Sequence, residues 1–357
     1  MKKVWWWALA ILFATTAGEI GCSSTSSGRT PTQQPTSTPT ITSTYTPVCP
    51  TWILKGSMVT ARNQFATAAL TCGGVAGLLA VGGVTAGSFC AASAEFYNPQ
   101  TDTWGATPPL PATRHGHAAA PVTRSGVTGV LVAGGVVGGS VATSVQFFDP
   151  SAGGWTPLTA MTTGRVGLVA APVVIGGVAG VLAAGGVDGG GFWLGSAEFY
   201  DPAGSWTVVA SMTTPRSEAA AAPVTFGGVA GVLVAGGGNP GGALSSAEFY
   251  NPVANTWQSV SPMAVVREDP VAAPVTVGGV QGVLVAGGAN SSGPLPWAEF
   301  YDPSTNSWSA ISSMNLGRYA AAAAPVTIGG RLGVLVSGGY LFNGTGRVLS
   351  ETEFFCP

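Results

Sequence analysis

Few side chains in this protein could take part in catalysis or bind a charged ligand. Among them, arginine recurs at the most regular spacing. Only 8% of the 357 residues are charged. A guanidinium group binds carboxylates and other anions through paired hydrogen bonds. The series could therefore bind an acidic ligand or form structural ion pairs. The arginines recur at intervals of 51 or 52 residues, at Arg62, Arg114, Arg165, Arg216, Arg267 and Arg318.

A matching series of glutamates favours the structural use. It comprises Glu95, Glu198, Glu248, Glu299 and Glu353. A partly buried charge needs a partner, so we expect ion pairs between these acids and the arginines. One repeat has Gln146 where the others have Glu. Arg114 is therefore the arginine that we expect to meet an anionic ligand, ahead of Arg165 and Arg216.

The two histidines, His115 and His117, flank Gly116 beside Arg114. Catalytic and structural metal sites use three or more ligands, and no further ligand residues cluster here. We therefore predict no metal and no cofactor, and a packing role for the histidines.

Three aromatic residues lie outside the repeated pattern, at Trp193, Trp297 and Tyr340. Aromatic rings on loops can stack on sugars or contact another protein. They can equally pack within their own loops, and the sequence leaves both interpretations open.

These residues are positioned by a repeat. The phrase GVLVAGG at Gly129–Gly135 returns at Gly231–Gly237 and Gly282–Gly288, and looser copies lie at Gly77–Gly83, Gly180–Gly186 and Gly333–Gly339. The glycine pairs of the six copies are spaced by 52 and then 51 residues along the chain. A period near 50 indicates radially arranged blades or an array. Each unit contains four strand-like segments separated by glycine or proline turns.

A glycine pair, then Glu-Phe-Tyr-Asp-Pro, then Trp, Met and Arg at this spacing resembles the kelch repeat over residues 49–357. The resemblance implies an all-β fold, a six-bladed β-propeller with four antiparallel strands per blade. It also implies that function lies on the loops of one face, since arginines at this repeat position bind acidic groups in kelch-type substrate adaptors.

The last unit ends at Phe355-Cys356-Pro357 without a tryptophan strand, whereas Trp52 and Met58 have the spacing of a fourth strand at the other end of the chain. We therefore expect the N-terminal strand to complete the sixth blade, which removes exposed sheet edges. The same alignment places Cys49 near Cys356, and we predict a disulfide between them. For Cys72 and Cys90, parity favours a bond and the alignment opposes one.

The first 48 residues predict an exported protein. Residues 1–22 have the charged start and short apolar core of a signal peptide, and Gly21-Cys22 resembles the end of a lipobox. Lipidation of Cys22 would make it the membrane anchor, although Glu19 departs from the lipobox pattern. In residues 23–48, 19 of 26 are Ser, Thr or Pro, which predicts a disordered tether.

A net charge near −2 gives no basic face for nucleic acid. We expect a monomeric, non-catalytic binding or scaffold propeller in the cell envelope or outside the cell, with a protein or carbohydrate ligand. The alternative is a carbohydrate-active enzyme that resembles the sugar mutarotases with kelch repeats. It would use an axial pair such as Arg216 with Glu218, or Glu268 with Asp269.

Overall fold

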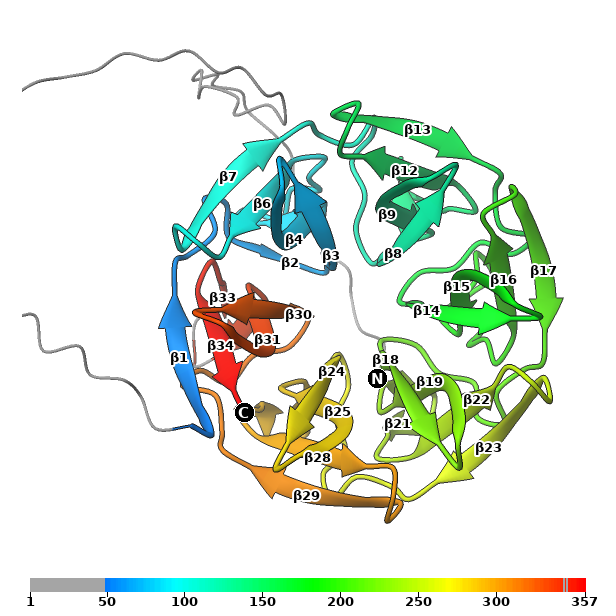
Figure 1. Cartoon of the computed structure of the whole chain (residues 1–357), viewed down its shortest axis with the longest axis vertical. Coiled ribbons are helices and arrows are strands. Elements are labelled where there is room, and N and C mark those ends of the chain that lie inside the picture. Colours follow the sequence, from blue (N-terminus) through cyan, green and yellow to red (C-terminus); the bar gives the residue numbers. More distant parts are fainter. Residues whose placement is uncertain (1–48, 343, 345) are drawn as a thin grey trace, which may run out of the picture.

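The protein is a ring of six β-sheets around a common axis (Figure 1). This computed structural model describes residues 49–342, 344 and 346–357. Within those ranges every regular element is a strand, and each blade is a four-stranded antiparallel sheet. The predicted six-bladed propeller is confirmed.

The strands of each blade run from the axis outward. In chain order the first five blades comprise β3 (Ala66–Cys72), β4 (Val75–Val81), β6 (Ala94–Asn98) and β7 (Thr103–Thr107); β8 (Ala118–Arg124), β9 (Val127–Ala133), β12 (Val145–Asp149) and β13 (Gly154–Leu158); β14 (Val169–Ile175), β15 (Val178–Ala184), β16 (Ala197–Asp201) and β17 (Ser205–Val209); β18 (Ala220–Phe226), β19 (Val229–Ala235), β22 (Ala247–Asn251) and β23 (Thr256–Val260); β24 (Val271–Val277), β25 (Val280–Ala286), β28 (Ala298–Asp302) and β29 (Ser307–Ile311). The sixth contains β30 (Ala322–Ile328), β31 (Arg331–Ser337), β34 (Thr352–Cys356) and β1 (Thr51–Lys55).

The repeated apolar phrase is the second strand of each blade. Its last five residues are buried in all six copies, because neighbouring blades cover both faces of the sheet. In the second blade, a Cβ on Gly129 would collide with the carbonyl oxygen of Phe148 and the ring of Phe147. Gly134 and Gly135 have φ angles of 68° and 82°, which disfavour side chains with a Cβ. The glycines are therefore required by packing and by backbone conformation.

The tryptophan of each outer strand joins its blade to the preceding one. Trp104 packs against Tyr97 of its own blade with ring centroids 5.2 Å apart. Its indole Nε1 donates to the carbonyl oxygen of Gly56, outside the blade, at 3.0 Å. In the sixth blade, the indole Nε1 of Trp52 likewise donates to the carbonyl oxygen of Ser312 at 2.7 Å. Trp52 is therefore the sixth equivalent tryptophan, as its spacing predicted.

The two ends of the described chain meet in one sheet. Strand β1 pairs with β34 in antiparallel register, with Thr51 opposite Cys356 and Trp52 opposite Phe355. The Cys49–Cys356 disulfide bridges residues 307 apart in sequence, with Cα atoms 5.5 Å apart. The predicted closure and disulfide are both confirmed.

The remaining described cysteines do not bond to each other. Cys90 is an exposed free thiol, and Cys72 ends β3 at the opposite end of the blade. The sequence left a Cys72–Cys90 bond open, and the structure shows that these two cysteines are not bonded to each other.

The predicted signal peptide, Cys22 and the tether all lie outside the described residues. In the described part of the chain, no helix is long and apolar enough to cross a membrane.

Removing the disulfide should destabilise the ring without changing its topology. The chain-entropy estimate for so long a loop is roughly 5 kcal/mol. Cys356→Ser should therefore lower the free energy of unfolding by an amount approaching this value, measured by denaturant titration of the purified protein. Oxidised wild-type protein is the comparison. Equal stability of oxidised wild type and Cys356→Ser would contradict the role of this bond.

Candidate functional site

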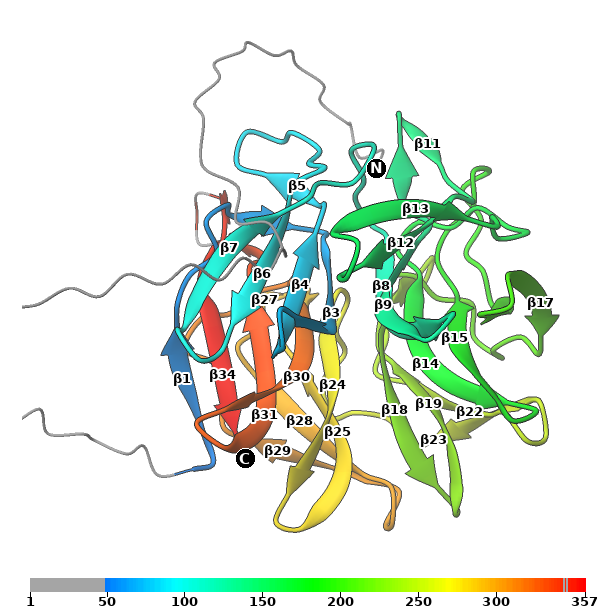
Figure 2. The same cartoon turned by 45° about the horizontal axis from the view of Figure 1, so that its top comes forward.

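The links between strands lie on two different faces of the propeller. Because strands alternate in direction, the link from the second strand to the third and the link from the fourth strand to the next blade share one face, here called the loop face. Short two-stranded ribbons rise there, such as β2 (Arg62–Asn63) with β5 (Val84–Thr85) (Figure 2). The opposite face, called the turn face, carries short turns between the first and second and the third and fourth strands.

The repeated arginines lie inside the blades beneath the loop face. All six are buried, at most 3% exposed. In the third blade, Arg165 donates through Nη1 to the carbonyl oxygens of Gly185 at 3.0 Å and Ser196 at 2.8 Å, and through Nη2 to Glu198 at 3.1 Å. Arg216 with Glu248 and Arg267 with Glu299 repeat this arrangement at 3.0 and 2.7 Å.

Each of these glutamates also fixes the link that carries the arginine. Glu198 accepts from the backbone N–H of Thr162 at 2.7 Å and of Thr163 at 3.2 Å. Burial alone would raise the pKa of Glu198, but the hydrogen bonds from Thr162 and Arg165 lower it below its usual value. The guanidinium groups of Arg165 and Arg216 are thus occupied within the blade and do not present themselves at the loop face.

Arg114 lacks a carboxylate partner, as its repeat predicted, but it is also buried. It donates to the carbonyl oxygens of Gly134 at 2.6 Å and Ser144 at 3.0 Å. Burial lowers the pKa of Arg114 to about 10. The second blade differs from the other five at two positions that act together. Gln146 stands in place of the glutamate. Pro111, which has no N–H, stands in place of the residue that donates to that glutamate in the other blades.

A ring of backbone hydrogen bonds closes the axis just beneath the loop face. Each residue two positions after a repeated arginine donates its N–H to the carbonyl oxygen of its counterpart in a neighbouring blade, at 2.7–3.3 Å. All six members have left-handed φ angles between 51° and 68°. We call this set the axial ring; its members are Gln64, Gly116, Gly167, Glu218, Asp269 and Ala320.

Three acids gather at one side of the axial ring. Burial, and then the charges of Glu218 and Glu268, raise the pKa of Asp269 well above its usual value. Arg216 forms its ion pair with Glu248 at 3.0 Å. Glu268 and Asp269, the other pair of the enzyme alternative, lie close enough to interact. Within the described ranges, no group of three or more His, Cys, Asp or Glu residues is arranged to hold a metal.

Several of the exposed side chains of the loop face are aromatic. Trp193 is 38% and Trp297 47% exposed, and Phe192 reaches 71%. Phe89 and Phe342, at 50% and 59%, extend the set to the first and sixth blades. Tyr340 contributes less, because its ring packs against Tyr319 with centroids 5.6 Å apart. The sequence identified both tryptophans from their place outside the repeat, and the three phenylalanines belong to the same variable loops.

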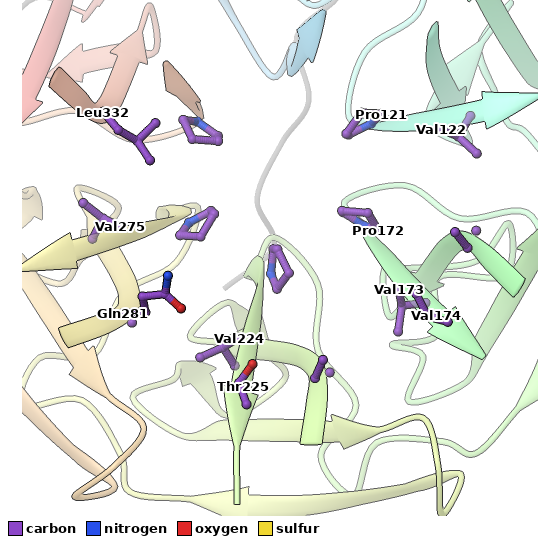
Figure 3. A pocket seen from close by; sticks show the side chains of 18 of the residues that line it. Pro121, Val122, Pro172, Val173, Val174, Val224, Thr225, Val275, Gln281 and Leu332 are labelled. Carbon is purple, nitrogen blue, oxygen red and sulfur yellow. The ribbon is translucent and has the colours of Figure 1, made fainter. Parts of the chain in front are cut away.

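A cavity of about 780 Å³ occupies the axis on the other side of the ring. Its walls are the innermost strands, and Pro121 and Pro172 point toward the axis (Figure 3). Thr225, Gln281 and Leu332 lie near the turns between first and second strands, so the cavity lies at the turn-face end of the axis. Its lining is mainly apolar. The cavity was not predicted from the sequence, although a proline recurs in five of the six innermost strands.

Breaking one buried ion pair should lower the free energy of unfolding more than a substitution at Gln146, the equivalent position in the blade that has no such pair. Glu198→Gln leaves the Arg165 charge without its carboxylate, and we expect a loss of about 3–5 kcal/mol in unfolding free energy. Gln146→Ala is the matched control and should cost about 1 kcal/mol or less, because the Gln146 Oε1 has no hydrogen-bond partner in the described structure. Equal losses in denaturant titrations would contradict the structural role of the pairs.

The same variant should reveal a pH dependence. Since the folded-state pKa of Glu198 is lowered, its carboxylate stabilises the fold above the unfolded pKa, and this contribution is lost as pH falls through the folded pKa. The stability difference between wild type and Glu198→Gln should therefore be constant near neutral pH and shrink below about pH 4. A difference that stays constant down to pH 3 would argue against an ionised Glu198.

Comparison with known proteins agrees with this architecture. The family model of the kelch motif matches residues 231–264 and 274–315, in the fourth and fifth blades. No curated protein matches. A solved structure entitled "Structure of YjhT" superposes with a TM-score of 0.65 at 14% identity, covering 83% of this chain and 95% of that one. That likeness concerns the fold alone. The chain is therefore a six-bladed β-propeller that carries kelch motifs in its fourth and fifth blades.

Proposed function

We propose that this propeller is an exported binding module that recognises a protein or a glycan through its loop face and performs no catalysis. The observation that carries the proposal is the set of exposed aromatic rings on that face, contributed by four different blades. Aromatic rings are enriched at binding hot spots and bind sugars by stacking. Function commonly resides on loops that a rigid scaffold holds in place.

The rigidity of the scaffold supports this proposal. The links that carry the rings are held from below by the buried arginines: Arg267, for example, donates to the carbonyl oxygen of Trp297 at 2.9 Å. The arginines therefore position the loop face instead of contacting a ligand themselves. This changes the expected roles of Arg114, Arg165 and Arg216 from ligand contacts to supports of the loops.

Export is supported by the disulfide between Cys49 and Cys356, since such bonds persist in oxidising compartments. The lipid anchor at Cys22 and a monomeric state remain part of the proposal. The enzyme alternative, a mutarotase-like activity, depends on the acids Glu268 and Asp269 beside the axial ring.

Two experiments test the aromatic surface. A glycan array probed with the purified protein should show binding without turnover of the bound sugar. A photo-crosslinking residue at position 193, in cells that make the protein, should capture a specific protein partner if the ligand is a protein. The same residue at position 253, an exposed site on the turn face, is the control. Turnover of a sugar, or equal crosslinking at both positions, would contradict the proposal.

Removing the rings should weaken binding but not folding. We expect Trp193→Ala and Trp297→Ala each to reduce affinity for the identified ligand about tenfold or more, as for hot-spot aromatics. Their melting temperatures should change little, because both side chains are substantially exposed. Val253→Ala on the turn face should leave affinity unchanged. Full affinity in the double tryptophan variant would show that the ligand binds elsewhere.

A further inference from the structure

A thiol and an imidazole meet on the loop face between the first and second blades. The Sγ atom of Cys90 lies 3.2 Å from Nδ1 of His115. Cys90 belongs to the loop between β4 and β6, and His115 to the link between β7 and β8. Cys90 directly follows Phe89 of the exposed aromatic set, and His115 directly follows the buried Arg114.

Backbone pairing holds both residues in place. Cys90 forms an isolated bridge with Val84, and His115 forms one with Val136 of the second blade. Cys90 is exposed, whereas His115 is half-buried. Burial lowers the pKa of His115, so at neutral pH the imidazole is uncharged and able to accept a proton. The thiol is therefore reachable from solvent with a base beside it.

The repeat does not require either side chain. Where the first blade has Cys90, the third blade has Trp193 and the second has Val141. Where the second blade has His115, its counterparts are Asn63 and Val166. Packing at these positions accepts several residue types, so the Cys–His combination is a local addition to the common scaffold.

A cysteine becomes a nucleophile as its thiolate, and an adjacent imidazole is the usual means of forming it. Cys49 and Cys356 are bonded to each other, and Cys90 is the free cysteine of the described residues. That part of the chain has no second free thiol that could displace, from within the molecule, a group attached to Cys90 through sulfur.

We propose that Cys90 and His115 form a thiol–disulfide exchange site that takes up one half of an external disulfide as a stable mixed disulfide. The thiol proton passes to Nδ1 of His115, and the Cys90 thiolate attacks one sulfur of the disulfide. The new S–S bond forms as the old one breaks, and the departing thiolate takes the proton from His115. The exchange involves no net oxidation or reduction.

Oxidised glutathione is the probe. The purified full chain should gain one glutathionyl group, located by peptide mass spectrometry to the peptide that contains Cys90. Cys90→Ser should abolish that adduct. His115→Asn and His115→Val, which place the residues of other blades at this position, should keep the melting temperature and slow the reaction at least tenfold.

The control is Cys90→Ser combined with Val141→Cys. It puts a thiol at the equivalent position of the next blade, where Val166 stands in place of His115. Its rate should match that of the His115 variants. Equal rates in wild type, His115→Asn and this control would overturn the proposal. A covalent dimer in place of the glutathione adduct would identify a second copy of the chain as the disulfide partner, and would retain the site.

Discussion

The structure depends on the pairing of β1 with β34, because a propeller with one incomplete blade would expose a sheet edge and leave its neighbours unsupported. Each blade is buried against the next through its second strand and its tryptophan, so no blade has a complete core of its own. The pairing places Thr51 opposite Cys356, where the disulfide can hold the two ends together. The axial ring repeats this closure at the centre, with backbone hydrogen bonds that link all six blades. Outer closure and inner closure together make the loop face rigid.

The buried arginines connect that scaffold to the loops. Each one binds carbonyl oxygens of the link from second to third strand, and its glutamate binds N–H groups of the link from the preceding blade. A charge in the interior is tolerated because these bonds satisfy it. The second blade lacks this pair of interactions. Gln146 replaces the carboxylate, and Pro111 lacks the N–H that would donate to that carboxylate. Arg114 keeps its carbonyl contacts there.

Much of this fold could be predicted from the sequence, because period, turn chemistry and the displaced Trp52 are all local signals. The Arg–Glu pairing followed from near-equal numbers of the two residues. Burial of Arg114 could not be predicted in the same way, since the sequence shows the missing acid but not the carbonyl oxygens of Gly134 and Ser144 that replace it. The axial cavity and the Cys90–His115 contact were also missed. Both arise from residues of different blades whose proximity depends on the angle between sheets.

The most direct test of the account is amide hydrogen exchange of residues 51–55 in the native protein. If β1 is the outer strand of the sixth blade, the amides that it donates to β34 should exchange as slowly as those of β29, the corresponding strand of the fifth blade. Exchange of residues 51–55 as fast as in the exposed loop around Phe89 would contradict the closed ring.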